Sequence, residues 1–274
     1  MVEIEILKSN VGDNFFYLIA DGGEAALVDP VDGEQAVEVV RRRGETLKYV
    51  LNTHFHPDHV AGNPTVLAAF EEAQVVCGTG DTDLVDAQFV PKGNRGVDRR
   101  VTGGGQLALG EIALEVVETP GHTAGHISYR VGEELFSGDT IFTAGAGNCR
   151  FGGDPAVLFR TFRDVLRELP EETRFYPGHD YAVRNAEFIL SIEPEQKLAV
   201  TVLEEAKKAA ATGELFQSTL GRERRYNPFL RYDDPKLLAR LREAHGDRLK
   251  EAQGVSDDDD EAVFRCLRAL RNEW

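Results

Sequence analysis

The chain contains 274 residues, of which 42% are hydrophobic, and it carries a formal net charge of −16 at pH 7. That length allows one large domain, or one of average size with a smaller partner, and the apolar content is ordinary for a protein with a core. The acidic balance argues against nucleic acid, whose phosphates need a basic surface, and no segment approaches the roughly 20 apolar residues of a membrane span. We therefore expect neither nucleic acid nor a membrane as a partner.

The cysteines and the first residues bear on the compartment. Cys77, Cys149 and Cys266 are odd in number and widely spaced, which is typical of free thiols rather than of a disulfide framework. The start of the chain lacks a basic segment followed by an apolar one, so we expect no export signal. These features predict a cytoplasmic protein. The acidic charge fits a high-salt cytoplasm and ordinary compositional drift equally well.

Strands and helices are mixed in the first two thirds of the chain. Apolar and β-branched runs bounded by turn residues predict strands, and apolar residues spaced three and four apart predict helices. In chain order we expect strands at 3–7, 15–20 and 25–29, a helix at 34–43, a strand at 46–53, a helix at 57–72, a strand at 74–77, an irregular excursion at 78–105, strands at 107–109, 112–118, 127–131 and 134–137, a helix at 156–169 and a strand at 173–176.

The pattern changes after about residue 182, where strand patterns all but vanish. The helices expected there are at 195–211, 235–245 and 261–271. Ser256 is a good N-cap for the last of them, and the acidic run 257–260 suits the positive end of a helix dipole better than a metal. Strands with helices and then a helical tail predict a layered α/β domain at 1–182 and a small helical domain at 183–274.

The densest group of candidate metal ligands lies in one heptapeptide and consists of His54, His56, Asp58 and His59. Neutral imidazole and carboxylate bind zinc, iron or manganese without unusual ionisation. Pro57 favours an extended conformation at His56 and suits the first position of a helix. His54 and His56 therefore project in the same direction, while Asp58 and His59 lie on the first helical turn and can face a second point nearby.

Three further candidate ligands, His122, Asp139 and His179, each follow a glycine at the end of a predicted strand. Such strand ends are expected to converge on one edge of an α/β domain. Asp139 alone fits a turn or helix cap equally well, and His126 fits a structural role beneath the site better than a ligand role. Seven ligands exceed the four of a closed structural zinc site, whereas two metals that share the Asp139 carboxylate account for the number. His245 is expected at the surface near a helix end.

In combination, the motifs THxHxDH, PGHT, GD and GH resemble the metallo-β-lactamase superfamily over roughly residues 1–182. The resemblance implies an αββα sandwich with the metals at one edge. It implies two divalent metal ions per chain, with zinc expected and iron or manganese as alternatives. The implied ligands are His54, His56 and His122 for one ion, Asp58, His59 and His179 for the other, and Asp139 as the bridge.

Motifs further along resemble glyoxalase II, the hydroxyacylglutathione hydrolases: GHDY at 178–181, EP at 193–194, STLG at 218–221 and NPFLR at 227–231. This similarity implies an enzyme that hydrolyses S-D-lactoylglutathione to D-lactate and glutathione in methylglyoxal detoxification, with 183–274 as a substrate-binding domain. We expect a monomer. The residues that it assigns to glutathione are Arg150, Tyr181, Arg268 and Arg271. A guanidinium fork suits the two carboxylates of glutathione, although arginines that only solvate an acidic surface are the alternative.

The chain departs from the glyoxalase II pattern in the loop after the GD motif. Residues 147–152 read GNCRFG, where the family usually has Gly-Cys-Gly-Arg-Phe and then an aromatic residue. Asn148 and Cys149 are therefore unusual, and Gly152 removes an aromatic that helps to hold glutathione. These changes concern the thiol half of the substrate and leave the metal ligands untouched.

The implied mechanism uses a metal-bound water, whose pKa is lowered to about 7, as the nucleophile that attacks the thioester carbonyl. The thiol has a pKa of about 8.5, so it leaves as a thiolate and needs no strong general acid. Asp139 and Asp58 are then the catalytic carboxylates, because one bridges the ions and the other holds its metal and orients the hydroxide. The alternatives are a mononuclear iron persulfide dioxygenase, a hydrolase of another thiol ester or lactone, and a metal-binding or thiol-sensing module without activity.

Overall fold

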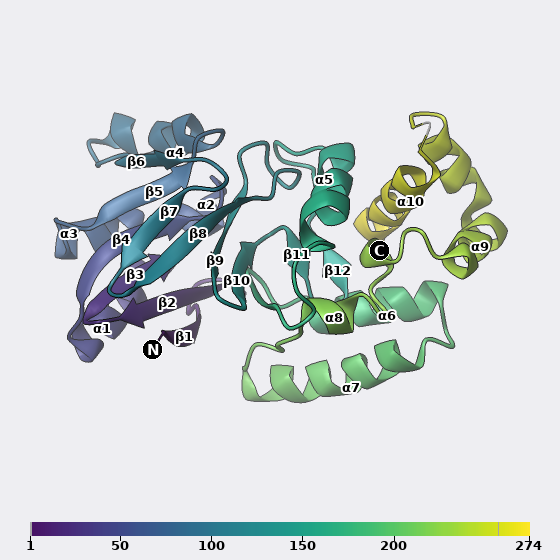
Figure 1. Cartoon of the computed structure of the whole chain (residues 1–274), viewed down its shortest axis with the longest axis horizontal. Helices are drawn as coiled ribbons and strands as arrows, with labels where there is room; N and C mark the ends of the chain where they lie inside the picture. Colours follow the sequence, from purple (N-terminus) through teal and green to yellow (C-terminus); the bar gives the residue numbers. More distant parts are fainter. Residues whose placement is uncertain (1, 257) are drawn as a thin grey trace.

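The computed structural model describes residues 2–256 and 258–274, and its strands form two packed sheets (Figure 1). The first sheet runs in the order β1 (Glu3–Lys8), β2 (Phe15–Asp21), β3 (Glu24–Val28), β4 (Thr46–Asn52), β5 (Gln74–Gly78) and β6 (Arg99–Val101). The second runs in the order β13 (Arg174–Pro177), β10 (Glu134–Gly138), β9 (Ile127–Val131), β8 (Ile112–Glu118) and β7 (Gln106–Leu109). A hairpin of β11 (Ile141–Phe142) and β12 (Gly145–Ala146) follows β10.

The helical segments fall into two groups along the chain. Those interleaved with the strands are α1 (Gly33–Arg43), α2 (Pro57–Val60), α3 (Asn63–Ala69), α4 (Thr82–Phe89), η1 (Val90–Lys92), α5 (Pro155–Thr161) and the π-helical turn η2 (Phe162–Leu166). Those that follow the last strand are α6 (Ala182–Ile192), α7 (Lys197–Thr212), α8 (Leu220–Glu223), η3 (Pro228–Leu230), α9 (Pro235–Gln253) and α10 (Asp259–Glu273). In residues 2–256 and 258–274, no helix has the length and apolar character needed to cross a membrane.

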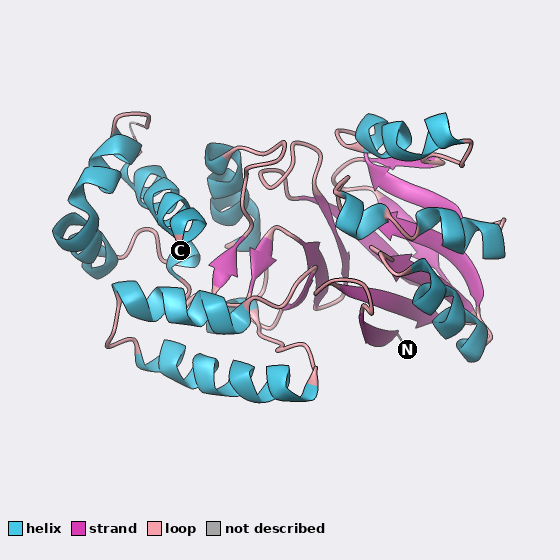
Figure 2. Cartoon of the chain, turned by 180° about the vertical axis from the view of Figure 1, so that it is seen from behind, coloured by secondary structure: helices cyan, strands magenta, loops and turns pink. Residues whose placement is uncertain are grey.

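Both faces of each sheet are covered, which explains the nearly continuous apolar strands. Every residue of β2 is buried; Phe15 packs between the sheets, and its neighbour Phe16 packs on the side of α1 and α3. Seen from behind, helices cover the outer face of the first sheet (Figure 2). The outer face of the second sheet contacts α5 and the carboxyl-terminal helices through a cluster that includes Leu135, Phe159 and Phe264. The expected αββα sandwich with a helical tail is confirmed.

Strand directions bring several strand ends to one edge of the sandwich. β10 and β13 are parallel, and β8 runs the same way as β10 because both are antiparallel to β9. The carboxyl ends of β8, β10 and β13 therefore lie together. The end of β4 in the other sheet lies beside them, since the amide of Ile127 donates a hydrogen bond of 2.9 Å to the carbonyl of Thr53.

Two predictions in the first half of the chain were wrong. The helix expected at 57–72 is broken into α2 and α3, because Pro64 in the first turn of α3 has no N–H group to bond to the turn before it. Gly62 packs so closely at this break that a Cβ there would lie 2.0 Å from the carbonyl oxygen of Pro30. The excursion at 78–105 contains α4, η1 and β6, and β6 extends the first sheet in parallel with β5. The buried side chains of Val85 and Phe89 are too few to give a clear helical pattern in the sequence.

The carboxyl-terminal helices also differ in detail from the expectation. Neither α6 nor the hairpin β11–β12 was predicted, and α9 continues past a kink at His245 (φ −137°, ψ 34°), which is half-buried. The N-cap of α10 is Asp258 rather than Ser256, and its carboxylate accepts hydrogen bonds from the amides of Asp260 and Glu261. Asp257, part of the predicted acidic run, lies outside the described residues.

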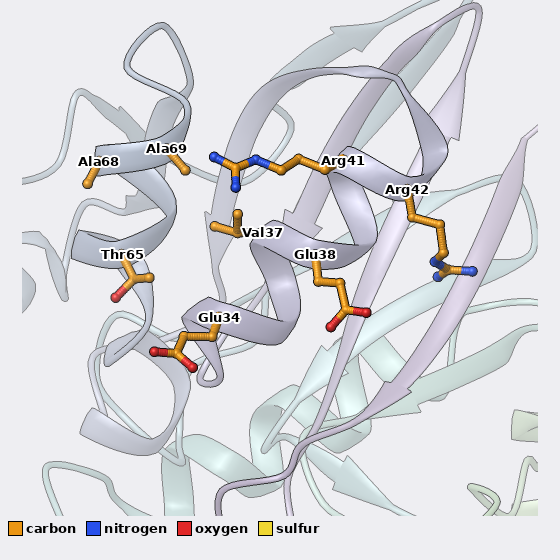
Figure 3. Close-up of a pocket in the computed structure, with 8 residues that line it drawn as sticks. All are labelled: Glu34, Val37, Glu38, Arg41, Arg42, Thr65, Ala68 and Ala69. Carbon is orange, nitrogen blue, oxygen red and sulfur yellow. The ribbon is translucent and has the colours of Figure 1, made fainter.

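An open groove lies between α1 and α3 (Figure 3). Its apolar floor comes from Val37, Ala68 and Ala69, and charged side chains such as Glu38 and Arg41 stand along it. None of the seven candidate metal ligands lines this groove. The candidate metal ligands lie instead at the strand ends.

Candidate metal centre

The seven candidate ligands are delivered by strand ends of both sheets. His56 caps α2 with extended backbone angles (φ −61°, ψ 140°), and Pro57 opens that helix, as predicted. Asp58 and His59 thus lie on the single turn of α2. His122, Asp139 and His179 follow β8, β10 and β13 and come from the opposite sheet.

The first ligand group consists of His54, His56 and His122. Nδ1 of His56 lies 3.0 Å from Nε2 of His54 and 2.9 Å from Nε2 of His122. A tetrahedral ion with metal–nitrogen bonds of about 2.0–2.1 Å holds its nitrogen ligands about 3.3 Å apart. The three imidazoles therefore converge at nearly the spacing that a metal ion requires.

The second ligand group consists of Asp58, His59 and His179, whose ligand atoms also lie within 4.8 Å of one another. Nε2 of His179 is 3.3 Å from Oδ2 of Asp58. Asp139 lies between the two groups. Its Oδ1 is 3.5 Å from Nε2 of His59, and its Oδ2 is 3.5 Å from Nε2 of His122 and 3.7 Å from Nε2 of His179.

Two buried polar atoms at the centre of this arrangement lack a hydrogen-bond partner within the described chain: Nε2 of His59 and Oδ1 of Asp139. A buried polar atom left unsatisfied costs about 1–3 kcal/mol, so such atoms in a native structure call for an explanation. Imidazole and carboxylate are ligands for divalent metal ions, and an ion between these two atoms would satisfy both. The clusters of His and Asp therefore fit divalent metal ions.

Asp29 and Asp81 support the ligands and were missed by the sequence analysis. Asp29 is buried with φ 50° and accepts hydrogen bonds from His59 Nδ1 (2.9 Å) and from the amide and hydroxyl of Thr53 (2.8 and 2.6 Å). Its oxygens orient His59 and fix its tautomer. Asp81 joins the loops of two ligands by accepting hydrogen bonds from the amide of Phe55 and the hydroxyl of Thr123. Asp29 follows β3 directly, so the strand-end rule that found Asp139 could have found it.

His126 lies beneath the site and uses both ring nitrogens inside the protein. Its Nε2 accepts a hydrogen bond of 3.2 Å from the amide of Asp139, and its Nδ1 lies 2.9 and 3.1 Å from the hydroxyls of Thr119 and Thr140. The ring also stacks on His54, with 5.0 Å between ring centroids. These contacts favour the structural interpretation of His126 over the ligand one.

The two ligand groups differ in protonation in the metal-free protein. Burial, reinforced by neighbouring imidazoles, lowers the pKa of His54 well below its usual value. Burial also lowers the pKa of His122 to about 4, although Asp139 opposes the change. Burial acts in the same direction on His59, but Asp139 and Asp29 outweigh it and raise that pKa to about 9. At neutral pH, His54 and His122 are therefore ready to bind a cation, whereas His59 must first lose a proton.

We expect the two metal-binding steps to differ in pH dependence. Binding at the group that contains His59 should gain at least about tenfold in affinity per pH unit from pH 7 up to about 9, because the proton on His59 competes with the ion. His179 adds to this competition, since burial lowers its pKa but Asp139 and Asp58 outweigh burial and raise that pKa. Binding at the group that contains His54 and His122 should change little over that range. Calorimetric titration of the metal-free protein in buffers of different ionisation enthalpy would count the protons released. An equal pH dependence of both steps would contradict this expectation.

A cavity of about 370 Å³ adjoins the metal centre and is lined by residues from both parts of the chain, including Phe142, Phe151, Tyr181, Arg150, Arg184, Arg268 and Arg271. Tyr181 connects the cavity to the centre, since its ring stacks on that of His179 with centroids 5.1 Å apart. Four arginines thus gather in a protein whose net charge is −16. Arg184, which was not predicted, is exposed on α6, and its charge helps to lower the pKa of Arg271 after the larger effect of burial.

The four residues expected to bind substrate occupy different environments. Arg150 is exposed and donates a hydrogen bond of 2.7 Å to the carbonyl of Asn272, and Arg271 is half-buried with its Nε on the side chain of Asn185 at 3.0 Å. Tyr181 is half-buried against His179. Arg268 differs, because it is only 4% exposed and donates to main-chain carbonyls.

Comparisons with known proteins agree with this architecture. The profile of the metallo-beta-lactamase superfamily matches residues 10–179, and that of the hydroxyacylglutathione hydrolase C-terminus matches residues 180–274. A hydroxyacylglutathione hydrolase of Polaromonas sp. is 40% identical and both chains are fully covered, and one of Nitrosococcus oceani is 37% identical with 98% of each covered.

Among solved structures, ETHE1 from Myxococcus xanthus is 25% identical with a TM-score of 0.64 and coverage of 88% of this chain and 90% of that one. TTHA1623 in a di-iron-bound form is 26% identical with a TM-score of 0.60 and coverage of 82% and 100%. The resemblance of the fold thus extends to a protein that holds two metal ions. With matches to both profiles and full-length relatives above 30% identity, the chain belongs to the hydroxyacylglutathione hydrolase family of the metallo-beta-lactamase superfamily.

Proposed function

We propose that this chain is a binuclear metal-dependent thioester hydrolase that converts S-D-lactoylglutathione to D-lactate and glutathione, as in methylglyoxal detoxification. The observation that carries the proposal is the Asp139 carboxylate between two ligand groups, next to a cavity with four arginines. The full-length relatives named hydroxyacylglutathione hydrolase support the same substrate.

The proposed ligand sets follow the two clusters. His54, His56 and His122 hold one ion, and Asp58, His59 and His179 hold the other, with Asp139 shared between them. Zinc is the expected metal, because imidazole and carboxylate ligands suit it. The same ligands accept iron or manganese, and a neighbouring fold is known in a di-iron form.

The protein side chains have separable roles in this reaction. When bound, the ions supply Lewis acidity, which polarises a carbonyl and lowers the pKa of water to about 7. Asp58 is exposed at the mouth of the site, where its carboxylate can orient the attacking oxygen by accepting its proton in a hydrogen bond. The leaving thiol has a pKa of about 8.5 and departs as a thiolate, so no acid is assigned to it.

The arginine cavity is proposed to hold the glutathione half of the substrate. Arg150, Arg184 and Arg271 reach it from the loop after β12, from α6 and from α10, respectively. A guanidinium binds a carboxylate through two parallel hydrogen bonds, and glutathione has two carboxylates. Phe151 is 68% exposed beside the metal centre and can cover the apolar part of the substrate in the place left by Gly152.

We also propose a domain boundary and a compartment for this chain. We place the boundary between a catalytic domain and a helical substrate-binding domain near residue 182, because the matched families adjoin at 179 and 180. A cytoplasmic location is supported by three free cysteines, two of them buried. The expected monomer stays a prediction.

The test is a thioester hydrolysis assay with metal analysis of the same sample. We expect two ions per chain, rapid turnover of S-D-lactoylglutathione and a kcat/KM at least about 100-fold lower for the lactoyl thioester of N-acetylcysteamine, which lacks both carboxylates. No turnover of any glutathione thioester would overturn the proposal. One iron per chain and oxygen uptake with glutathione persulfide would instead identify a persulfide dioxygenase.

A further inference from the structure

The segment Ala146–Phe151, here called the carbonyl loop, contacts two metal-ligand histidines through its main chain. The carbonyl of Asn148 accepts a hydrogen bond of 2.6 Å from Nδ1 of His122, and that of Phe151 accepts one of 2.9 Å from Nε2 of His56. In both rings the opposite nitrogen is the one that faces the first ligand group, where the two lie 2.9 Å apart. The carbonyl loop therefore fixes the tautomer and the rotation of both imidazoles.

The carbonyl loop is in turn held from helix α10. One terminal nitrogen of Arg268 donates hydrogen bonds of 2.6 Å to the carbonyl of Ala146 and 3.2 Å to that of Gly147. The guanidinium lies over the ring of Phe229, 5.5 Å from its centroid, and the side chain is only 4% exposed. Nε of Arg268 is also buried and has no partner among the described residues, while the side chain still forms part of the cavity wall.

These contacts separate Arg268 from the other arginines of the cavity. Arg271 lies on the same helix, but its Nε donates to the side chain of Asn185, and within the described residues it makes no hydrogen bond to the carbonyl loop. Two carbonyls turned into a buried environment need a donor, and Arg268 supplies it. Its removal would leave both oxygens unsatisfied and free the loop to move.

We propose that Arg268 is a positioning residue: by holding the carbonyl loop it orients His56 and His122, so that helix α10 sets the affinity of the first metal group. This proposal rests on the metal centre of the proposed function. It differs from the role implied by family resemblance, in which Arg268 binds the carboxylates of glutathione.

If Arg268 acted only through its charge, its removal would change metal affinity in the opposite direction from the one expected of a positioning residue. Removal of a cation near the site lowers repulsion and should tighten metal binding slightly. Loss of the loop anchor should weaken it, because outer groups that orient a ligand typically contribute about 10–100-fold in metal affinity. The sign of the change in Arg268→Met therefore identifies the role.

The experiment measures zinc affinity of the full-length metal-free protein by competition with a chromophoric chelator, together with the visible spectrum of the cobalt-loaded protein and the KM for S-D-lactoylglutathione. We expect Arg268→Met to lower the affinity of the first group by about tenfold and to alter the cobalt absorption bands. Arg271→Met is the matched control, since it removes the same charge from the same helix. It should bind metal as tightly as the wild-type protein or slightly more tightly, and it should raise KM.

Unchanged or tighter metal binding in Arg268→Met, with a raised KM, would overturn the proposal and make Arg268 a substrate ligand. Should that variant fail to fold by circular dichroism, Arg268→Lys carries the test, because it keeps the charge but its shorter side chain cannot place a nitrogen where the guanidinium holds the two carbonyls. It is expected to lower affinity about threefold, and wild-type affinity in it would equally overturn the proposal. If the wild-type protein bound no metal, the proposed function itself would fail, an outcome distinct from any difference between variants.

Discussion

Replacement of Asp139 with asparagine is expected to lower kcat for thioester hydrolysis by roughly 10³-fold. Mutation of a residue that only hydrogen-bonds to a metal ligand typically costs about 10–100-fold, and a shared ligand should matter more. Asp139 is buried; its Oδ1 faces His59 of the second group, and its Oδ2 lies between His122 of the first group and His179 of the second. An amide offers one oxygen and one N–H group, so it can serve one ion at most. The measurement is kcat together with the metal content per chain, which should fall below two.

The matched control is Asp164→Asn. That carboxylate is on the surface and pairs with Arg163 at 2.7 Å, far from the metal ligands in the fold. Exposed ion pairs contribute about 0–1 kcal/mol, so turnover and metal content should stay at wild-type levels. A variant Asp139→Asn that retained two ions and more than about a tenth of its turnover would exclude a bridging role.

Alanine at position 178 is expected to remove the second ion and to lower kcat by at least about 100-fold. A Cβ on Gly178 would lie 2.4 Å from Cε1 of His59 and 2.6 Å from Oδ1 of Asp139. The backbone cannot retreat easily, because the Gly178 amide donates to Gly138 (3.0 Å) and its carbonyl accepts from Phe15 (2.8 Å). Two metal ligands must therefore move. Metal analysis and turnover on the purified variant would check this.

Gly246→Ala is the matched control, because it makes the same substitution where the added methyl group has room. A Cβ there would meet nothing within 4 Å, and the residue lies in α9. Turnover and metal content should be unchanged, and stability should rise by up to about 1 kcal/mol, since alanine favours helix. Equal behaviour of the two variants would show that the close packing at Gly178 is not required for the centre.

Much of the candidate site could be predicted from the sequence, because the candidate ligands share one local pattern. An apolar strand followed by a turn and a His or Asp marks a strand end, and strand ends meet at one edge of a layered α/β fold. His122, Asp139 and His179 were found in this way, and the structure brings them next to the ligands after β4. The αββα layers followed from the resemblance that these motifs carry.

The features that were missed depend on contacts between distant segments. The requirement for glycine at position 62 depends on the carbonyl of Pro30, and the orientation of His59 depends on Asp29. Arg184 belongs to no recognisable motif, and its place in the cavity is set by the packing that brings α6 opposite α10. The bonds of Arg268 to the carbonyl loop could not be read from its helical spacing. Periodicity reports local structure, whereas these interactions are set by tertiary packing.

Each proposed ligand group takes residues from both sheets, so an ion bound there would crosslink the two sheets as well as take part in the reaction. His56 and His122 are 66 residues apart in sequence, and one ion would tie them across the layers. A ligand that binds only the folded state at 100 times its Kd adds about 2.7 kcal/mol of stability. The ions proposed to act on the substrate would thus also join the two sheets at this edge, beside hydrogen bonds such as that from the amide of Phe15 to the carbonyl of Gly178. Loss of metal would loosen the fold at the place where its function resides.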